Sequence, residues 1–253
     1  MSEDEFEILT EKLRGRAKFL YFHLMGEPTL HPLLPRFISI AKEKGFSSII
    51  TTNGSLLAAK GDAILENLPY KVSISLHAPE ANPAFDGSGY LDACVAFAKQ
   101  AAKGGCYIAL RLWNLGSDAD NSDILAFLRR KFPNEWVDLR GGSSQRLDTR
   151  IFLEWGERFD WPDSDLSECG ENEETFCYGL RDQIGVLCDG SVVPCCLDAE
   201  GAITLGNLFE SSLEEILESP RAKAIYDGFS RRRAVEPLCR KCGYAKRFTK
   251  LKK

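Results

Sequence analysis

Six cysteines in the last third of the chain have the residue type and spacing to bind a metal. They are Cys177, Cys188, Cys195, Cys196, Cys239 and Cys242. The pair Cys239 and Cys242 has C-x2-C spacing, which brings two thiolates to one metal centre. A second pair comes from Cys177 and from the Cys195 or Cys196 end of a predicted hairpin. We therefore predict a four-thiolate site with Cys177, Cys195, Cys239 and Cys242 as ligands, and with Cys188 and Cys196 as further candidates.

The ligand chemistry leaves the metal open, because four thiolates suit Zn and an iron–sulfur cluster equally well. A disulfide framework is less favoured, since the N-terminus shows no secretory signal and thiols stay reduced in the cytoplasm. We therefore predict a cytoplasmic protein. Of the nine cysteines, Cys94 and Cys106 are expected to be buried as small hydrophobic residues. Cys169 lies in an acidic segment, and the sequence assigns it no role.

A second group of polar residues follows four strand-like runs. Its members are Gly26, Glu27, Pro28, Thr29, Thr52, Asn53, Gly54, Ser73, Ser75, His77, Arg111 and Asn114. In parallel α/β sheets, ligands bind at the carboxyl ends of the strands. These residues are expected to form a polar ring for a small ligand with amine, carboxylate and ribose groups. Taken alone, Thr-Asn-Gly is most often a turn and His77 is more often structural.

The elements that would position these residues alternate regularly. Apolar, strand-like runs cover 18–25, 47–54, 70–78, 107–114 and 150–155. Helical periodicity covers 3–14, 33–44, 56–67, 90–103 and 119–131. Strands that alternate with helices in this way predict βαβ units and a parallel sheet.

The pattern changes after about residue 155. Nine acids and one arginine between Glu154 and Glu174 indicate a linker. The predicted organisation is a partial barrel at 1–155, a linker at 156–176 and a Cys-rich domain at 177–253. In that domain Asp189-Gly190 predicts a hairpin turn, and Ser212 with Glu215 predicts a capping box that begins a helix over 213–226.

Composition and charge exclude several classes of protein. Hydrophobic residues make up 44% and charged residues 27%, as in ordinary globular proteins. No run of about 18 apolar residues predicts a membrane span. The net charge of −5 argues against a protein whose whole surface binds nucleic acid. Residues 221–253 carry twelve basic and two acidic residues. We interpret them as a solvated basic helix and tail, with docking of an acidic partner or nucleic acid as the alternative.

Together these motifs resemble radical S-adenosylmethionine (AdoMet) proteins that carry a C-terminal SPASM/Twitch-type auxiliary cluster domain. Gly26-Glu27-Pro28-Thr29 resembles the GGEP element of that family, with Met25 in place of its first glycine. The C-terminal pattern resembles the SPASM pattern; it comprises Cys177, Gly190-x4-Cys195-Cys196, Gly206-Asn207-Leu208 and Cys239-x2-Cys242. The match covers nearly the whole chain, and its C-terminal part is the specific one.

The resemblance implies a fold, a site and cofactors. The fold is α/β: a (βα)6-type, TIM-like partial barrel that lacks its first strand, followed by a small Cys-rich α+β domain. The cofactors are AdoMet and an auxiliary [4Fe–4S] cluster, with Zn as the alternative. The resemblance places AdoMet or substrate against Gly26, Glu27, Pro28, Thr52, Asn53, Ser75, His77 and Arg111.

One departure from the family is large. The C-x3-C-x2-C loop that holds the AdoMet-cleaving cluster in that family is absent from the 253 residues. In the family this loop precedes a helix like residues 3–14. We expect a truncated chain rather than a degenerate member, because a first strand at 18–25 would leave an unprotected sheet edge. We accordingly expect this chain to be inactive alone.

Two functions follow as hypotheses. The first is a radical SAM enzyme that cleaves AdoMet reductively, forms a 5′-deoxyadenosyl radical and abstracts a substrate hydrogen. A peptide or protein is the first candidate substrate and a small molecule the second. Its expected partner is a one-electron donor such as ferredoxin or flavodoxin. The second hypothesis is a non-catalytic Zn or iron–sulfur module that docks a partner.

Overall fold

The computed structural model describes residues 1–77, 87–115, 120–139, 141–157, 159, 162 and 174–249. The chain divides into two compact units. One unit is Arg14–Arg158, and the other combines Met1–Leu13 with Phe159–Lys253. Cys169 lies outside the described residues. In the described part of the chain, no helix combines the length and the apolar character needed to cross a lipid bilayer.

A seven-stranded sheet with the strand order β1-β2-β3-β4-β7-β6-β5 forms the centre of the Arg14–Arg158 unit. The strands are β1 (Phe19–Tyr21), β2 (Ser47–Thr52), β3 (Lys71–Ser75), β4 (Tyr107–Leu115), β5 (Val137–Asp138), β6 (Ser144–Asp148) and β7 (Ile151–Glu157). The helices are η1 (Pro28–Leu30), α2 (Leu34–Glu43), α3 (Leu57–Glu66), α5 (Tyr90–Lys103) and α6 (Ser122–Lys131). Strands β1 to β4 and β7 run parallel. The predicted α/β class with a mainly parallel sheet is confirmed.

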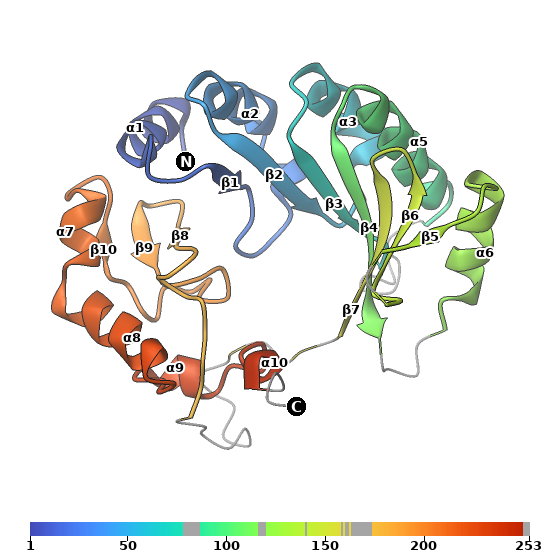
Figure 1. Cartoon of the computed structure of the whole chain (residues 1–253). Helices are drawn as coiled ribbons and strands as arrows, with labels where there is room; N and C mark the ends of the chain where they lie inside the picture. The colour runs from blue at the N-terminus through green and yellow to red at the C-terminus, as the bar shows by residue number, and fades with distance from the viewer. Residues whose placement is uncertain are drawn as a thin grey trace. The chain divides into compact units, whose positions relative to one another are not determined.

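Alternation along the strands creates two different faces. Val72, Ile74, Leu110 and Leu153 point to one face and belong to a core that includes residues of α2, α3 and α5. Figure 1 shows these helices along that face of the sheet. Because side chains alternate along a strand, the residues between them point to the other side, which we call the inner face.

Strand β1 is an edge strand, as expected, but it is shorter than the predicted run 18–25. It pairs with β2 alone, and the last hydrogen bond between them runs from the Phe22 N–H to the Ile49 carbonyl at 2.9 Å. The exposed fractions of Phe19 and Tyr21 are 37% and 55%. A strand supported on one side gains fewer backbone hydrogen bonds, which accounts for its early end.

The antiparallel strands β5 and β6 were not predicted. They extend the sheet beyond β7, so β7 is not its edge. Both are short, and β6 reads Ser-Gln-Arg-Leu-Asp, which has no apolar run. Pairing with β7, rather than local sequence preference, makes this segment a strand.

The second unit contains a three-stranded antiparallel sheet in the order β10-β9-β8. Its elements are α1 (Glu3–Leu13), β8 (Gly185–Val186), β9 (Ser191–Val193), β10 (Gly206–Asn207), α7 (Leu213–Leu217), α8 (Pro220–Ser230), α9 (Pro237–Arg240) and α10 (Lys246–Thr249). The predicted hairpin is confirmed: β8 pairs with β9 around Gly190, whose φ is +87°. The capping box of Ser212 and Glu215 is also present.

Two details differ from the sequence prediction. The helix expected over 213–226 is two helices, because Ser219 caps a new helix whose first residue is Pro220. Helix α1, expected in the barrel, groups with the C-terminal unit. There the Lys12 ammonium donates hydrogen bonds to the carbonyls of Leu208 and Ser211. Such contacts between distant segments leave no local pattern in the sequence.

Candidate functional sites

The carboxylate of Glu27 connects two strand-end segments of the inner-face site. Its Oε1 atom accepts hydrogen bonds from the Thr29 N–H (3.0 Å), the Thr29 hydroxyl (2.6 Å) and the Thr52 hydroxyl (2.8 Å). Its Oε2 atom accepts one from the Asn53 N–H at 2.7 Å. The structure thus brings together Glu27, Thr52 and Asn53, three residues of the predicted site. A carboxylate offers about four acceptor positions, two per oxygen, so Oε2 can accept a further donor.

The turn after β2 has a structural reason for its glycine. Gly54 has a φ of +77°, and a Cβ atom there would come within 2.7 Å of the Cys94 sulfur. Only glycine fits a backbone that is both left-handed and this close to a helix.

Cys94 and Cys106 are buried as predicted, and burial raises the pKa of each thiol to about 12. Both thiols are therefore protonated and inert at neutral pH.

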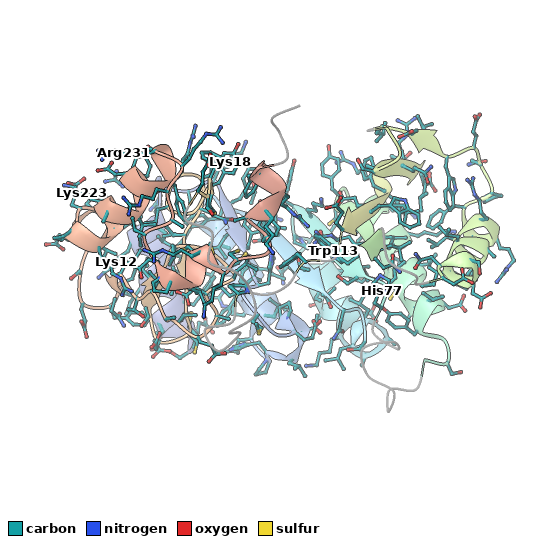
Figure 2. All side chains as sticks on the ribbon, turned by 90° about the horizontal axis from the view of Figure 1, so that it is seen from below. Lys12, Lys18, His77, Trp113, Lys223 and Arg231 are labelled. Carbon is teal, nitrogen blue, oxygen red and sulfur yellow. The ribbon has the colours of Figure 1, made fainter. Side chains whose placement is uncertain are left out.

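Tyr90 connects the second and third strand ends. Its hydroxyl lies within hydrogen-bond distance of the carbonyls of Asn53 (2.7 Å) and Ser75 (3.0 Å), which share its single proton. His77 lies just beyond β3, and its Nε2 atom accepts a hydrogen bond from the backbone N–H of Trp113 at 3.0 Å (Figure 2). This bond assigns the proton of a neutral imidazole to Nδ1. Asn114 instead exchanges two side-chain hydrogen bonds with Asn121, the N-cap residue of α6.

Arg111 belongs to a charged row on the inner face that the sequence analysis did not identify. Glu154 on β7 pairs with Lys71 on β3 (Nζ to Oε1, 3.0 Å) and lies 3.9 Å from the Arg111 Nε atom. The Arg111 guanidinium lies over the ring of Trp113, 4.1 Å from its centroid. A lone acid in the apolar run RIFLEW was the available signal for Glu154.

His23, at the end of the first strand-like run, was also missed. Its Nδ1 atom is buried and has no hydrogen-bond partner among the described residues. Burial lowers the pKa of this imidazole, and the nearby positive charge of Arg111 lowers it further. A neutral histidine with an unpartnered nitrogen therefore lies close to Arg111.

Five of the six clustered cysteines in the C-terminal unit come close together. In every pair that can be formed among Cys177, Cys195, Cys239 and Cys242, one thiol raises the pKa of the other. Cys196 is connected in this way with Cys177, Cys195 and Cys242, but not with Cys239. Cys188 is exposed, whereas the other five are half-buried.

Burial is the main cause of the raised thiol pKa values at this cluster, and it raises the pKa of Cys195 to about 12. Backbone N–H groups oppose it by donating to sulfur, as from Gly179 to Cys177 at 3.4 Å. Similar donors reach Cys195 from Leu197, and Cys242 from Ala245 and Tyr244. N–H groups directed at sulfur stabilise thiolates and tune the potential of an iron–sulfur cluster.

Two kinds of metal group suit four thiolates. A mononuclear Zn site needs four ligands around one atom, whereas a [4Fe–4S] cluster binds each thiolate at a different iron.

The comparisons with known proteins agree with this geometry. Residues 177–243 match the model of the SPASM family, described as an iron–sulfur cluster-binding domain. No curated protein matches the sequence of the chain.

Among solved structures, native anSMEcpe with bound AdoMet is 16% identical with a TM-score of 0.60, over 100% of this chain and 82% of that one. BtrN in complex with AdoMet and 2-DOIA is 18% identical with a TM-score of 0.55, over 96% of this chain and 80% of that one. SuiB of Streptococcus suis is 14% identical with a TM-score of 0.57, over 89% of this chain and 61% of that one.

At these identities the structural likeness establishes the fold, and the family match establishes the C-terminal domain. Both agree with the family named from the sequence motifs. Residues 177–243 therefore form a SPASM domain, in a chain that has the fold of radical SAM enzymes.

Proposed function

We propose that this chain comprises the AdoMet-binding barrel and the auxiliary-cluster domain of a cytoplasmic radical SAM enzyme that modifies a peptide or protein. The observation that carries the proposal is the SPASM match over 177–243, which contains all four thiols that influence one another. A small-molecule substrate is the second candidate, since BtrN was solved with 2-DOIA beside AdoMet.

In this proposal Cys177, Cys195, Cys239 and Cys242 hold one [4Fe–4S] cluster. Cys195 rather than Cys196 is the proposed ligand, because the Cys195 thiol raises the pKa of Cys239 and Cys196 does not. When bound, such a cluster supplies one-electron transfer or a site for substrate coordination. The backbone N–H groups around the sulfur atoms would stabilise the negative charge of the thiolates.

On the inner face, Glu27 and Arg111 bind the methionine part of AdoMet in this proposal. The Glu27 Oε2 atom accepts one hydrogen bond and has capacity for an ammonium donor. Gly26 has a φ of +92°, and no atom lies within 4 Å of the position of a Cβ. Its backbone is therefore open to a ligand. The Arg111 guanidinium is suited to a carboxylate and is held in place by Trp113 and Glu154.

Reductive cleavage of AdoMet needs a further cluster and an electron. The nine cysteines include no C-x3-C-x2-C set, so we propose that this chain binds AdoMet without cleaving it alone. We further propose that the electron comes from a protein donor such as ferredoxin or flavodoxin.

Metal analysis of anaerobically purified protein tests the cluster. We expect about four irons and four sulfides per chain, with broad absorption near 400 nm. Cys195→Ser should lose most of this iron, whereas Cys196→Ser and the buried control Cys94→Ala should keep it. Zinc in place of iron would overturn the proposal in favour of a non-catalytic Zn module.

Calorimetric titration with AdoMet tests the inner-face site. Arg111→Gln should weaken AdoMet binding about tenfold, the usual loss for a charged hydrogen bond of roughly 1.5 kcal/mol. Arg129→Gln, a control on α6 whose guanidinium lies over Trp136, should leave binding unchanged. Equal affinity of wild type and Arg111→Gln would remove Arg111 from the site.

A further inference from the structure

Three consecutive arginines, Arg231 to Arg233, follow the last residue of helix α8 and have an unusual backbone. The N–H groups of Arg232 and Arg233 donate to the carbonyls of Phe229 (3.0 Å) and Gly228 (2.8 Å). These two bonds define a Schellman motif, whose left-handed position is usually glycine. Here that position is Arg232, with a φ of +58°. A non-glycine residue in this conformation is strained, and such strain often occurs at functional sites.

The left-handed conformation of Arg232 places its side chain away from the side chains of its two neighbours. Arg231 and Arg233 both line a cavity of about 360 Å³, and Arg240 of α9 lines it too. The Arg232 guanidinium instead lies 5.7 Å from the ring centroid of Phe176. The backbone turn thus places two of three adjacent arginines at one cavity, where Arg240 adds a third.

The wall of this cavity is held in place by close packing. A Cβ atom on Gly228 would come within 2.7 Å of the Arg233 carbonyl and 2.9 Å of Val235. The Arg240 guanidinium donates to the carbonyls of Ala234 (3.1 Å) and Val235 (3.3 Å). Helix α8 and the chain after it are therefore in direct contact, and the Arg240 guanidinium is held against this backbone.

We propose that this cavity binds a small phosphate-bearing ligand. Its charged lining is three arginines and one acid, Asp227, so it carries a net charge of +2. Guanidinium groups bind phosphate through paired, charge-assisted hydrogen bonds, and several of them can share its oxygens. The rest of the lining is small or aliphatic, and the volume is in the range of small-molecule sites.

Stabilisation of the helix C-terminus alone does not explain this arrangement. A basic residue near a helix C-terminus interacts favourably with the helix dipole, but this effect is confined to the last turn and does not require Arg240 of α9 at the same cavity. The cavity includes none of the six clustered cysteines, so this inference goes beyond the proposed enzyme function.

Calorimetric titration of the full chain in phosphate-free buffer tests the site, with inorganic phosphate, pyrophosphate and citrate as probes. We expect saturable binding of pyrophosphate or phosphate at one site per chain, tighter than binding of citrate. Arg231→Gln and Arg233→Gln should each weaken it about tenfold. The control is Lys223→Gln, which removes the same charge from a residue of α8 that pairs with Glu218. Figure 2 labels Lys223 and Arg231. It should change the affinity less than twofold.

A further variant distinguishes loss of binding from loss of folding in the glutamine variants. Arg231→Lys keeps the charge but loses the paired geometry, so it should weaken binding several-fold with an unchanged circular dichroism spectrum. The proposal is overturned by non-saturating phosphate and pyrophosphate titrations, by citrate binding as tightly, or by Lys223→Gln weakening binding as much as Arg231→Gln.

Discussion

Removal of the Glu27 carboxylate is the sharpest test of how the strand ends are held together. Glu27→Ala deletes an acceptor of four hydrogen bonds from Thr29, Thr52 and Asn53. The two hydroxyl donors can turn to other acceptors and water can accept from the exposed Asn53 N–H, but the N–H of the buried Thr29 loses its partner. At about 1.5 kcal/mol for the buried bond to a charged acceptor and about 0.5 kcal/mol for the exposed one, we expect a loss of about 2 kcal/mol in the free energy of unfolding.

Glu27→Gln distinguishes hydrogen bonding from simple loss of contact. Its amide oxygen can replace Oε1, but its NH2 group would then face the Asn53 N–H, which is also a donor. We expect about half of the alanine effect. A double-mutant cycle with Thr29→Val should give a coupling energy of about 1 kcal/mol, since the Thr29 hydroxyl lies 2.6 Å from Oε1.

Urea unfolding followed by tryptophan fluorescence measures these effects. Three of the four tryptophans, Trp113, Trp136 and Trp155, lie in the Arg14–Arg158 unit, so most of the signal reports on the unit that contains Glu27. The matched control is Glu43→Ala on α2, whose carboxylate accepts from Ser39 and pairs loosely with Arg36. It should cost less than about 0.5 kcal/mol. An effect of Glu27→Ala no larger than that of the control would refute the reasoning.

Three further predictions follow. Gly156→Ala should lower the free energy of unfolding by about 2 kcal/mol in urea titrations, because its Cβ would come within 2.2 Å of the Trp113 ring; a change below about 0.5 kcal/mol would contradict the packing. Arg232→Gly should raise the free energy of unfolding, measured by thermal unfolding, by about 1 kcal/mol, because it relieves the left-handed strain. The control Arg231→Gly should lower the free energy of unfolding; a change of the same sign in both variants would show that strain is not the cause. His23 has a lowered pKa in the folded protein, so its contribution to stability is full above about pH 6.5 and is lost as the pH falls below that value. His23→Gln should reduce this dependence in unfolding midpoints measured from pH 7.5 to 5.5, and an identical dependence would exclude His23.

Several features of the site could be predicted because local sequence carries them. Apolar runs that alternate with helical periodicity indicate a parallel sheet, and the spacing of Cys239 and Cys242 indicates a metal site. The turn at Asp189-Gly190 and the capping box at Ser212 depend on neighbouring residues alone. Each of these patterns determines the backbone geometry of a few neighbouring residues, so the sequence is sufficient to predict that local structure.

Other features depend on which distant segments meet, and this is visible only in the folded chain. Glu154 faces Lys71 and Arg111 because its strand, β7, pairs with β4. Strands β6 and β5 lie on the other side of β7. Likewise, the grouping of α1 with the C-terminal unit follows from long-range contacts.

The proposed choice of Cys195 over Cys196 is of the same kind, since the spacings of these two residues to every other cysteine differ by a single residue. Their different relation to Cys239 arises only when the hairpin folds against the C-x2-C turn. The amino-acid sequence by itself determined the kinds of element and the kinds of ligand. Chain folding decided which side chains meet, because side-chain interactions act over a few ångströms regardless of separation along the chain.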